Sequence, residues 1–277
     1  YNTHYMGYYA NMVANEMFMD SASLRESVVS HAKHLNVIPN SVTAPQALLD
    51  MSFTPTGSPI SLTITKDTKF TTSISGQSYT FTTTAAKTIY PFGGVYSVTN
   101  LPIKEGKILN KSYTVNLSDV TQRFVIPNAN VDTSTISVQV QNSSSDTTVV
   151  TWTDGNSLDV TTITSYQKVY FLQEVEEGKY EIIFGDGAVG KQLADGNIIF
   201  IEYLVTKGIE ANKANSFTAV GTVAGLSSGN YTLSVAAVAT GGASAETISS
   251  LKNNAPKLYQ AQKRATTKDD YKAILLA

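Results

Sequence analysis

Apolar positions recur along this chain at two different periods, and the first to appear is the helical one. Up to about residue 50 the apolar residues at helical spacing are Tyr9, Met12, Val13 and Met17, followed by Leu24, Val28, Ala32 and Leu35. Spacings of three and four residues place side chains on one face of a helix. The pattern predicts two helices, with Ser23 and Glu26 as the capping box of the second, and a short third helix near Pro45.

From about residue 60 to 240 the period changes to two, the spacing of a strand with one buried face. The β-rich runs cover residues 62–65, 69–72, 79–83, 113–117, 123–126, 136–140, 148–152, 169–174, 179–184, 198–205 and 231–238. Turn residues separate them, among them Asp154-Gly155, Asp195-Gly196 and Gly229-Asn230. Short strands with frequent turns predict antiparallel sandwiches or small barrels rather than a doubly wound parallel sheet.

Helical patterning returns after Gly241-Gly242. Helix starts are expected at Ser244, at Ala255-Pro256, and at Thr267 with Asp270 as its capping partner. The first of these helices should run to about residue 254. The predicted fold is therefore α+β, with helical N- and C-terminal segments flanking mostly antiparallel β-sandwich or barrel-like domains.

The first predicted helix is unusually rich in large apolar side chains, which are Tyr5, Tyr8, Tyr9, Met17, Phe18 and Met19. They occupy most of the helix circumference, so the helix must bury two faces. One face should pack on this chain. The other should pack on another subunit, or on further chain, because the sequence starts at Tyr1 and stops at Ala277 inside a helical pattern and is expected to be part of a longer protein.

Charge narrows the classes of partner. Charged residues make up only 15% of the 277 residues, the formal net charge is −2, and the pI is near 5.9. Phosphate neutralisation needs a basic face, so nucleic acid and anionic membrane are not expected as partners. No apolar run approaches the ~20 residues of a spanning helix. Cysteine is absent, which excludes disulfides and thiolate metal sites.

The stretch from Gly185 to Lys191 fits G-x-G-x-x-G and comes within one residue of the Walker A pattern. A phosphate loop needs a helix directly after its glycines, because the helix N-terminus receives the anion. Only six residues, 191–196, separate Gly190 from Asn197, where the next extended run begins, and Gln192 stands where Walker A requires Ser or Thr. Gly185, Asp186, Gly187 and Gly190 are therefore interpreted as a structural turn, in a β-arch or a hairpin.

Other candidates for chemistry are weaker. His31 and His34 could share a helical face, but no third metal ligand is indicated nearby, so they are interpreted as solvated residues. The sequence has no G-x-S-x-G, no H-E-x-x-H and no cysteine nucleophile. We therefore expect no catalytic residues, no metal, no cofactor and no small-molecule substrate, and the protein is not expected to be an enzyme.

With the glycine loop interpreted as structural, its sequence FGDGAVGKQLADGNIIFIEY resembles a pattern of phage baseplate wedge proteins of the baseplate-J-like type. That pattern is F-G-D-G-x-x-G, then a D-G turn and a strand ending in Tyr. The C-terminal part is similar to the same family, at Gly241, Gly242, Glu246, Thr247, Ala255, Pro256, Arg264, Thr267, Asp270 and Tyr271. The segment HAKHLNVIPNSVTAPQALL resembles the helical segment before the family's first β domain. The similarity is greatest to wedge subunits of T4-like contractile tails.

This resemblance implies a structural role. Such subunits form a ring around the tail hub, bind other wedge proteins, and rearrange when sheath contraction is triggered. It therefore implies a virion protein of the tail baseplate, assembled in the host cytoplasm, that binds other wedge proteins and itself, as a dimer within a ring. The expected subunit contacts are Tyr5, Tyr9, Met12 and Phe18 in the first helix, and Arg264, Asp270 and Tyr271 in the last segment.

The expected domain organisation has one β domain inserted in another. The divisions are residues 1–54, an N-terminal helical segment; 55–109 with 208–242, a β domain; 110–207, the inserted β domain; and 243–277, a C-terminal helical segment. An insertion would explain why the ends resemble the family while residues 60–170 match it only in general character. The alternative function is a carbohydrate-binding tail protein or surface adhesin, and a third is an enzyme that binds a nucleotide at the Gly185 loop.

Overall fold

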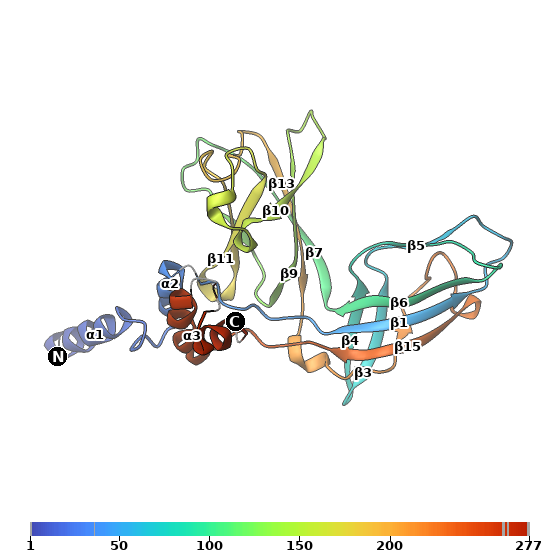
Figure 1. Ribbon diagram of the computed structural model, residues 1–277, viewed down its shortest axis with the longest axis horizontal. Helices are drawn as coiled ribbons and strands as arrows, with labels where there is room; N and C mark the ends of the chain where they lie inside the picture. The colour runs from blue at the N-terminus through green and yellow to red at the C-terminus, as the bar shows by residue number, and fades with distance from the viewer. Residues whose placement is uncertain (1, 36, 262–263, 265, 276–277) are drawn as a thin grey trace.

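The computed structural model describes residues 2–35, 37–261, 264 and 266–275, and in these residues two β-sheets stand beside a small group of helices (Figure 1). The helices are α1 (Asn2–Glu16), α2 (Arg25–His34), α3 (Ile248–Ala261) and α4 (Lys268–Leu275). Short 3-10 turns are η1 (Gly155–Ser157), η2 (Val160–Thr162), η3 (Glu176–Gly178), η4 (Gly208–Ala211) and η5 (Ser228–Asn230). Helical ends and a central β region confirm the α+β prediction.

The first sheet has six strands in the order β14-β3-β4-β6-β1-β15. Their bounds are β14 (Thr218–Ala219), β3 (Lys69–Ile74), β4 (Gln77–Thr83), β6 (Tyr96–Glu105), β1 (Gln46–Phe53) and β15 (Tyr231–Thr240). Every pairing within this sheet is antiparallel. A separate antiparallel pair, β2 (Leu62–Ile64) and β5 (Lys87–Ile89), contributes Leu62, Ile64 and Ile89 to the same hydrophobic core.

The second sheet has seven strands in the order β7-β13-β9-β10-β11-β12-β8 and curls into a nearly closed barrel. Their bounds are β7 (Lys107–Thr114), β13 (Ile198–Val205), β9 (Val131–Gln141), β10 (Val149–Asp154), β11 (Val169–Glu174), β12 (Tyr180–Phe184) and β8 (Phe124–Ile126). Only β10 and β11 pair in parallel. The two edge strands approach each other where the Tyr113 hydroxyl donates to the Val125 carbonyl and the Tyr113 and Phe124 rings meet edge to face.

The chain passes between the two sheets twice. It enters the barrel at Gly106, between β6 and β7, and leaves it after Val205 at the end of β13. Each sheet has its own hydrophobic core, and a third, smaller cluster joins α2 to α3 through Val28, Val29 and Leu251. In the sequence, the barrel strands therefore lie between β6 and β14, which are both strands of the first sheet.

The helix expected near Pro45 is wrong, because residues 46–53 form β1. Helix-forming residues such as Leu48 and Leu49 favoured the wrong element. In the structure burial alternates along β1, with Ala47, Leu49, Met51 and Phe53 buried. The strand lies between β6 and β15, so packing on both sides overrides local propensity. Helical structure in the N-terminal segment therefore ends at His34 in the described residues, well before the expected boundary at 54.

The predicted capping boxes have different outcomes. Thr267 and Asp270 form one at the start of α4, where the Asp270 amide donates to Thr267 Oγ1 at 3.2 Å and the Thr267 amide donates to Asp270 Oδ2 at 2.7 Å. The box at Ser23 and Glu26 is wrong. Ser23 donates its amide and its hydroxyl to the Glu16 carboxylate instead, at 2.8 and 2.7 Å. A charged acceptor from the preceding helix is stronger than a neutral hydroxyl.

The C-terminal helix starts also differ from expectation. One helix, α3, runs through Pro256, and the hydroxyl of Thr247 rather than Ser244 accepts an amide hydrogen bond at its start. A proline inside a helix costs about 3 kcal/mol. Helix α3 nevertheless continues because Leu251 and Ala255 are fully buried against α2, and Leu258 adds a further contact beyond the proline.

Candidate functional site

The Gly185 loop joins two strands that do not pair with each other. Strand β12 lies between β11 and β8, whereas β13 lies between β7 and β9. The connection is therefore an arch rather than a hairpin, and no helix follows it within residues 185–197. The glycines match their backbone, since Gly187 and Gly190 have φ of +88° and +80° and a Cβ on Gly185 would stand 2.4 Å from the carbonyl carbon of Gly190.

Hydrogen bonds inside this loop use the groups that a phosphate would need. Asp186 Oδ1 accepts from the amides of Ala188 and Val189 at 2.9 and 3.0 Å, and the Gly187 amide donates to the Gly190 carbonyl at 3.1 Å. The two amides bonded to Asp186 lower the pKa of its carboxyl. An anion would meet a carboxylate and occupied amides, so the geometry favours a structural turn.

Helix α1 projects from the rest of the molecule (Figure 1). Its neighbourhood exposes eight large apolar side chains, by 41% to 72%, which are Tyr5, Met6, Tyr8, Tyr9, Met12, Val13, Met17 and Phe18. The expectation that one face packs on this chain is wrong for the described residues. The apolar residues that follow the helix and enter the α2–α3 cluster are Met19 and Ala22.

Polar contacts attach α1 at its C-terminal end. Glu16 caps α2 through Ser23 and also accepts from the Leu24 amide at 3.3 Å. His31 Nε2 lies 3.0 Å from the Glu16 carbonyl. These contacts hold the C-terminal end of α1 against α2. The apolar sides of α1 stay uncovered by the described residues.

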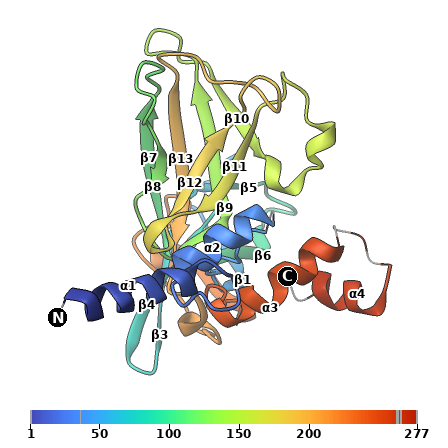
Figure 2. The same ribbon diagram turned by 90° about the vertical axis from the view of Figure 1, so that its left-hand side faces the viewer.

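The three C-terminal candidate residues differ in what they do within the chain. Asp270 is used locally, since its carboxylate also accepts from Thr266 Oγ1 at 2.8 Å. Tyr271 is 57% exposed and Arg264 is exposed. Helices α1 and α4 lie on opposite sides of the α2–α3 pair (Figure 2), so the structure does not bring the two candidate contact regions together.

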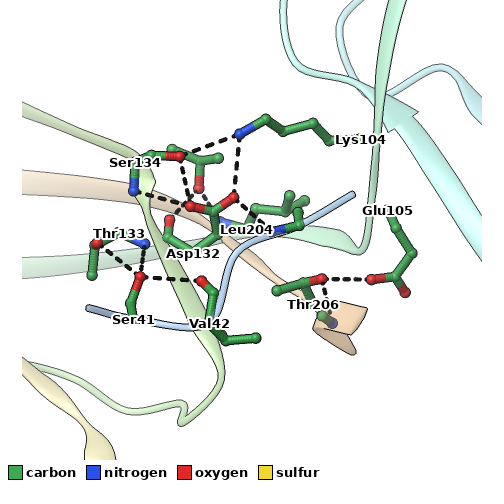
Figure 3. A network of polar contacts seen from close by, with 12 residues as sticks. Ser41, Val42, Lys104, Glu105, Asp132, Thr133, Ser134, Leu204 and Thr206 are labelled. Atoms are coloured by element: carbon green, nitrogen blue, oxygen red, sulfur yellow. Dashed lines mark hydrogen bonds and ion pairs between the residues drawn. The ribbon is translucent and has the colours of Figure 1, made fainter. Parts of the chain in front are cut away.

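A polar network at the junction between the two sheets was not found by sequence reasoning (Figure 3). Asp132, at the start of β9, has a side chain only 1% exposed. It accepts from the Ala44 amide at 3.0 Å, from Lys104 Nζ at 3.2 Å, and from the Ser134 amide and hydroxyl at 3.1 and 2.6 Å. One carboxylate of the barrel thus binds both β6 and the segment before β1.

Further contacts cross the same junction. Ser41 Oγ lies 2.9 Å from Thr133 Oγ1 and accepts from the Thr133 amide at 3.1 Å. Glu105 Oε2, at the end of β6, accepts from Thr206 Oγ1 at 2.6 Å and from the Lys207 amide at 2.9 Å. Burial raises the pKa of Glu105, although these hydrogen bonds partly oppose the effect. The signal for this network was the charged run Lys104-Glu105-Gly106-Lys107 in a chain otherwise poor in charge.

The connections themselves are tightly packed at two glycines. A Cβ on Gly106, whose φ is +129°, would stand 2.4 Å from the Val205 carbonyl oxygen. A Cβ on Gly208, whose φ is +63°, would stand 2.7 Å from Val42 Cγ2. A side chain does not fit at either position. At Gly106 the chain entering the barrel touches the chain leaving it, and at Gly208 the chain leaving the barrel touches the segment before β1.

An arginine joins the helices to the barrel. Arg25 of α2 donates from Nε and Nη2 to the Glu174 carboxylate of β11, at 2.5 and 2.9 Å, and from Nη1 to the Glu246 carbonyl. The Glu174 side chain is 1% exposed. A two-point pair of this kind fixes direction as well as distance.

The described residues do not have the features of a metal site or of a membrane-spanning helix. Within them no three His, Asp or Glu side chains gather in a way that could hold a metal ion. None of the described helices is long and apolar enough to cross a membrane. The features that remain are exposed apolar surface and polar contacts between parts of the chain.

Comparison with known proteins shows which proteins this chain is similar to. Residues 110–212, which include most of the barrel, match the family described as "Bacteriophage baseplate wedge protein gp6, third domain". Over 236 residues the chain is 24% identical to the baseplate wedge protein gp6 of Enterobacteria phage T4, covering 79% of this chain and 34% of that protein. The chain spans about a third of the length of this curated relative.

These matches confirm the resemblance to phage baseplate wedge proteins that the sequence motifs predict. Both matched names describe a baseplate wedge protein of a bacteriophage. Neither matched name describes an enzymatic activity.

Proposed function

We propose that this chain is a structural part of a baseplate wedge and that its helix α1 is a subunit contact. The observation that carries the proposal is the exposed apolar surface of that helix. Residues 2–15 contain no Asp, Glu, Lys or Arg, so α1 has no charged face to turn towards water. Burial of apolar surface yields about 25 cal/mol per Å², which makes such a helix a strong contact once it is covered.

Helix length supports the same conclusion. Isolated helices shorter than about 12–15 residues are marginal in water, and tertiary packing supplies most helical stability. Helix α1 has 15 residues and packs against little of the described chain. The partner that covers α1 is a second copy of the chain or another wedge protein. The contact residues are Tyr5, Tyr9, Met12 and Phe18. Arg264 and Tyr271 supply a second contact, in which Asp270 holds the start of α4 in place.

The arrangement of the two sheets suits a structural role in which the barrel acts as a spacer domain. The barrel, residues 107–205, serves as an inserted domain whose position is set by the Asp132 and Glu105 contacts and by the Arg25–Glu174 pair. Because these contacts come from both connected parts, the two sheets move together when the baseplate rearranges. The chain performs no chemistry of its own and needs no cofactor or metal.

The test is the mass of the protein in solution. Tyr9→Asp with Met12→Asp places two carboxylates on the exposed side of α1, and analytical ultracentrifugation measures association over a range of concentrations. We expect the unaltered chain to associate and the double variant to be monomeric. Tyr166→Asp is the matched control, because Tyr166 is 86% exposed on a barrel loop away from α1. Monomers for both the unaltered chain and the double variant, at every concentration, would overturn the role of α1 between copies.

A further inference from the structure

Strand β15 forms one edge of the first sheet. It pairs with β1, and none of the described strands lies on its other side. Figure 1 shows it on the side of the sheet that faces away from the barrel. Natural proteins protect edge strands with charged residues, prolines or short lengths, because an open edge offers unpaired amides and carbonyls. Strand β15 has ten residues, and residues 214–245 contain no Asp, Glu, Lys, Arg or Pro. It is therefore a long edge without the usual protection.

The other sheet edges in the described part of the chain are protected. Strands β14, β8, β2 and β5 have two or three residues each. Strand β7 is longer, but it carries Lys107 and Lys111, and its Tyr113 hydroxyl donates to the Val125 carbonyl of the opposite edge strand, β8. Strand β15 differs from each of these edges because it is both long and uncharged.

Pairing with β1 determines which backbone groups of β15 are free. Asn230 faces β1, because its carbonyl accepts from the Thr54 amide at 2.8 Å. Backbone groups of successive residues in a strand point to opposite sides. The register with β1 is unbroken over residues 231–235, so Thr232 and Ser234 face β1 as well. The amides and carbonyls that point to the open side are those of Tyr231, Leu233 and Val235.

Both ends of this open side are closed within the chain. Turn η5 comes directly before it. Beyond Val235 the register with β1 shifts, and Ala239 makes two backbone hydrogen bonds, with Lys213 and Ala214, at 2.7 and 2.9 Å. The open part is therefore residues 231–235, which we call the free edge. Strand β1 already holds it in an extended conformation, so little ordering entropy opposes its pairing with another strand.

The free edge is complementary to a second copy of itself. Antiparallel pairing about a two-fold axis at Leu233 places Leu233 opposite its own copy and Tyr231 opposite Val235 of the second copy. Each pair joins two residues whose backbone groups point outward, so each pair exchanges two hydrogen bonds. A register shifted by two residues leaves one outward residue of each copy without a partner. The register centred on Leu233 is therefore favoured.

The side chains suit the same register. Those of Tyr231, Leu233 and Val235 are half-buried against the core of the first sheet. On this face the register pairs an aromatic residue with a β-branched one, a combination that stabilises antiparallel strands. On the outer face the exposed Thr232 stands opposite Ser234 of the second copy, and hydroxyl pairs of this kind also stabilise. No charges meet on either face, so the composition of the strand favours a second copy as its partner.

We propose that the free edge pairs with the free edge of a second copy, antiparallel about Leu233, and joins the two first sheets into one. Main-chain hydrogen bonds supply the affinity when a strand is added to a sheet. The pairing is short, so it belongs to the weak class of interfaces, which bury less than about 1,200 Å². It strengthens where other contacts hold two copies close together. The contact is isologous and closes on itself. It goes beyond the proposed function, because it uses a surface other than α1.

Disulfide trapping detects a weak contact and reports its register, and the chain has no cysteine of its own. Thr232→Cys and Ser234→Cys are made in chains with different affinity tags, and the two are mixed under mild oxidation. The proposed register places these positions opposite each other, within the ~7 Å between Cα atoms that a disulfide allows. We expect the mixed dimer in several-fold higher yield than either same-site dimer. It should also exceed the dimer of Thr232→Cys with Tyr166→Cys, which lies at an exposed barrel site.

Hydrogen exchange in the linked dimer tests the backbone pairing itself. The amides of Tyr231, Leu233 and Val235 should exchange at least about tenfold more slowly than in the reduced chains, because pairing covers them. The amides at positions 232 and 234 are the internal control, since they already face β1 and should change little. Slower exchange at alternate positions is a signature that non-specific aggregation does not produce.

Equal yields of the mixed and same-site dimers, or of the mixed dimer and the Tyr166→Cys control, would overturn the inference. So would a linked dimer in which exchange at the three outward amides is unchanged. Repeating the trapping in chains that also carry Tyr9→Asp and Met12→Asp separates this contact from α1. The mixed dimer should persist there, whatever those changes do to association through the helix. Its loss would mean that α1 alone brings the copies together, and would reject the free edge as a contact of its own.

Discussion

Asp132 at the junction between the sheets is buried and binds four donor groups, whereas Tyr5, Tyr9 and Phe18 of the N-terminal region are exposed and contact little of the described chain. Polar groups are usually at the surface of a protein and apolar groups inside it. In these two regions the positions are reversed, and each reversal serves a different purpose.

Directional contacts suit the junction because they define an angle between two sheets. A buried carboxylate is costly unless it is fully paired, so only one arrangement of the surrounding segments is favourable. Apolar contact has no preferred direction and scales with the area removed from water. Such a surface tolerates different partners or positions, which suits the proposed role of α1 as a helix that is covered only on assembly.

The largest expected effect comes from removing the central carboxylate of the junction. Asp132→Ala leaves Lys104 and the Ala44 amide without their acceptor, where the Asp132 side chain is only 1% exposed and that of Lys104 is 20% exposed. Breaking a buried ion pair by removing one partner costs about 3–5 kcal/mol. We expect a loss of that size in the free energy of unfolding, measured by urea denaturation. If the loss is no greater than for an exposed aspartate, the junction does not fix the two sheets.

The matched exposed residue is Asp146, in the turn between β9 and β10. It too accepts local hydrogen bonds, from the Asn142 side chain at 2.7 Å and the Thr148 amide at 3.0 Å, and these lower the pKa of its carboxyl. Its removal costs no partner outside its own turn. We expect Asp146→Ala to change the free energy of unfolding far less than Asp132→Ala does, since exposed contacts contribute little.

Local patterns predicted much of the fold, and failed where long-range contacts decide. Strands β11 and β13 match their predicted ranges, because alternation and flanking turns are local signals. Strand β1 was missed because its partners, β6 and β15, are distant in sequence. Thr267 with Asp270 was recognised as a cap, whereas Glu16 as the cap of α2 depends on the path of the chain between two helices.

The candidate site divides in the same way. The exposed aromatic residues of α1 could be selected from the sequence, because too many apolar side chains on one short helix indicate a missing partner. Asp132 could not, since nothing near it in the sequence indicates that Ala44 and Lys104 converge on it. Gly106 gave a local signal, as the glycine of a charged run, but its contact with Val205 follows only from the fold.

A smaller effect is expected at the second carboxylate of the junction. Burial raises the pKa of Glu105 above its ordinary value of 4.5. The protonated form is therefore favoured by folding, and the stability that it contributes is present below about pH 4.5 and lost as pH rises through the folded pKa. Glu105→Gln stays neutral and can still accept from Thr206 and the Lys207 amide.

Urea denaturation at several pH values tests this sign. We expect Glu105→Gln to gain stability relative to the unaltered chain as pH rises from about 4 to 7. Of the two side chains compared at this position, only the glutamate becomes charged in that range. Thr206→Val, which removes the hydroxyl donor, should increase the penalty for the charged form. A constant difference between Glu105→Gln and the unaltered chain across that range would show that the junction accommodates the charge without cost.

The smallest and most local effect is expected where α1 joins α2. Hydrogen bonds from the Ser23 hydroxyl and amide lower the pKa of Glu16 to about 2. A carboxyl with a lowered pKa stabilises the fold above its unfolded pKa of about 4.5 and loses that contribution as pH falls through about 2. NMR titration of the Glu16 carboxyl carbon should give a midpoint near 2, and Ser23→Ala should move it back towards the ordinary value. Because α1 is attached through this carboxylate and the His31 contact, protonation of Glu16 should loosen the attachment of the helix. A Glu16 midpoint near 4.5 in the unaltered chain would instead mean that α1 is not held at this point, and that its direction is set only when a partner covers it.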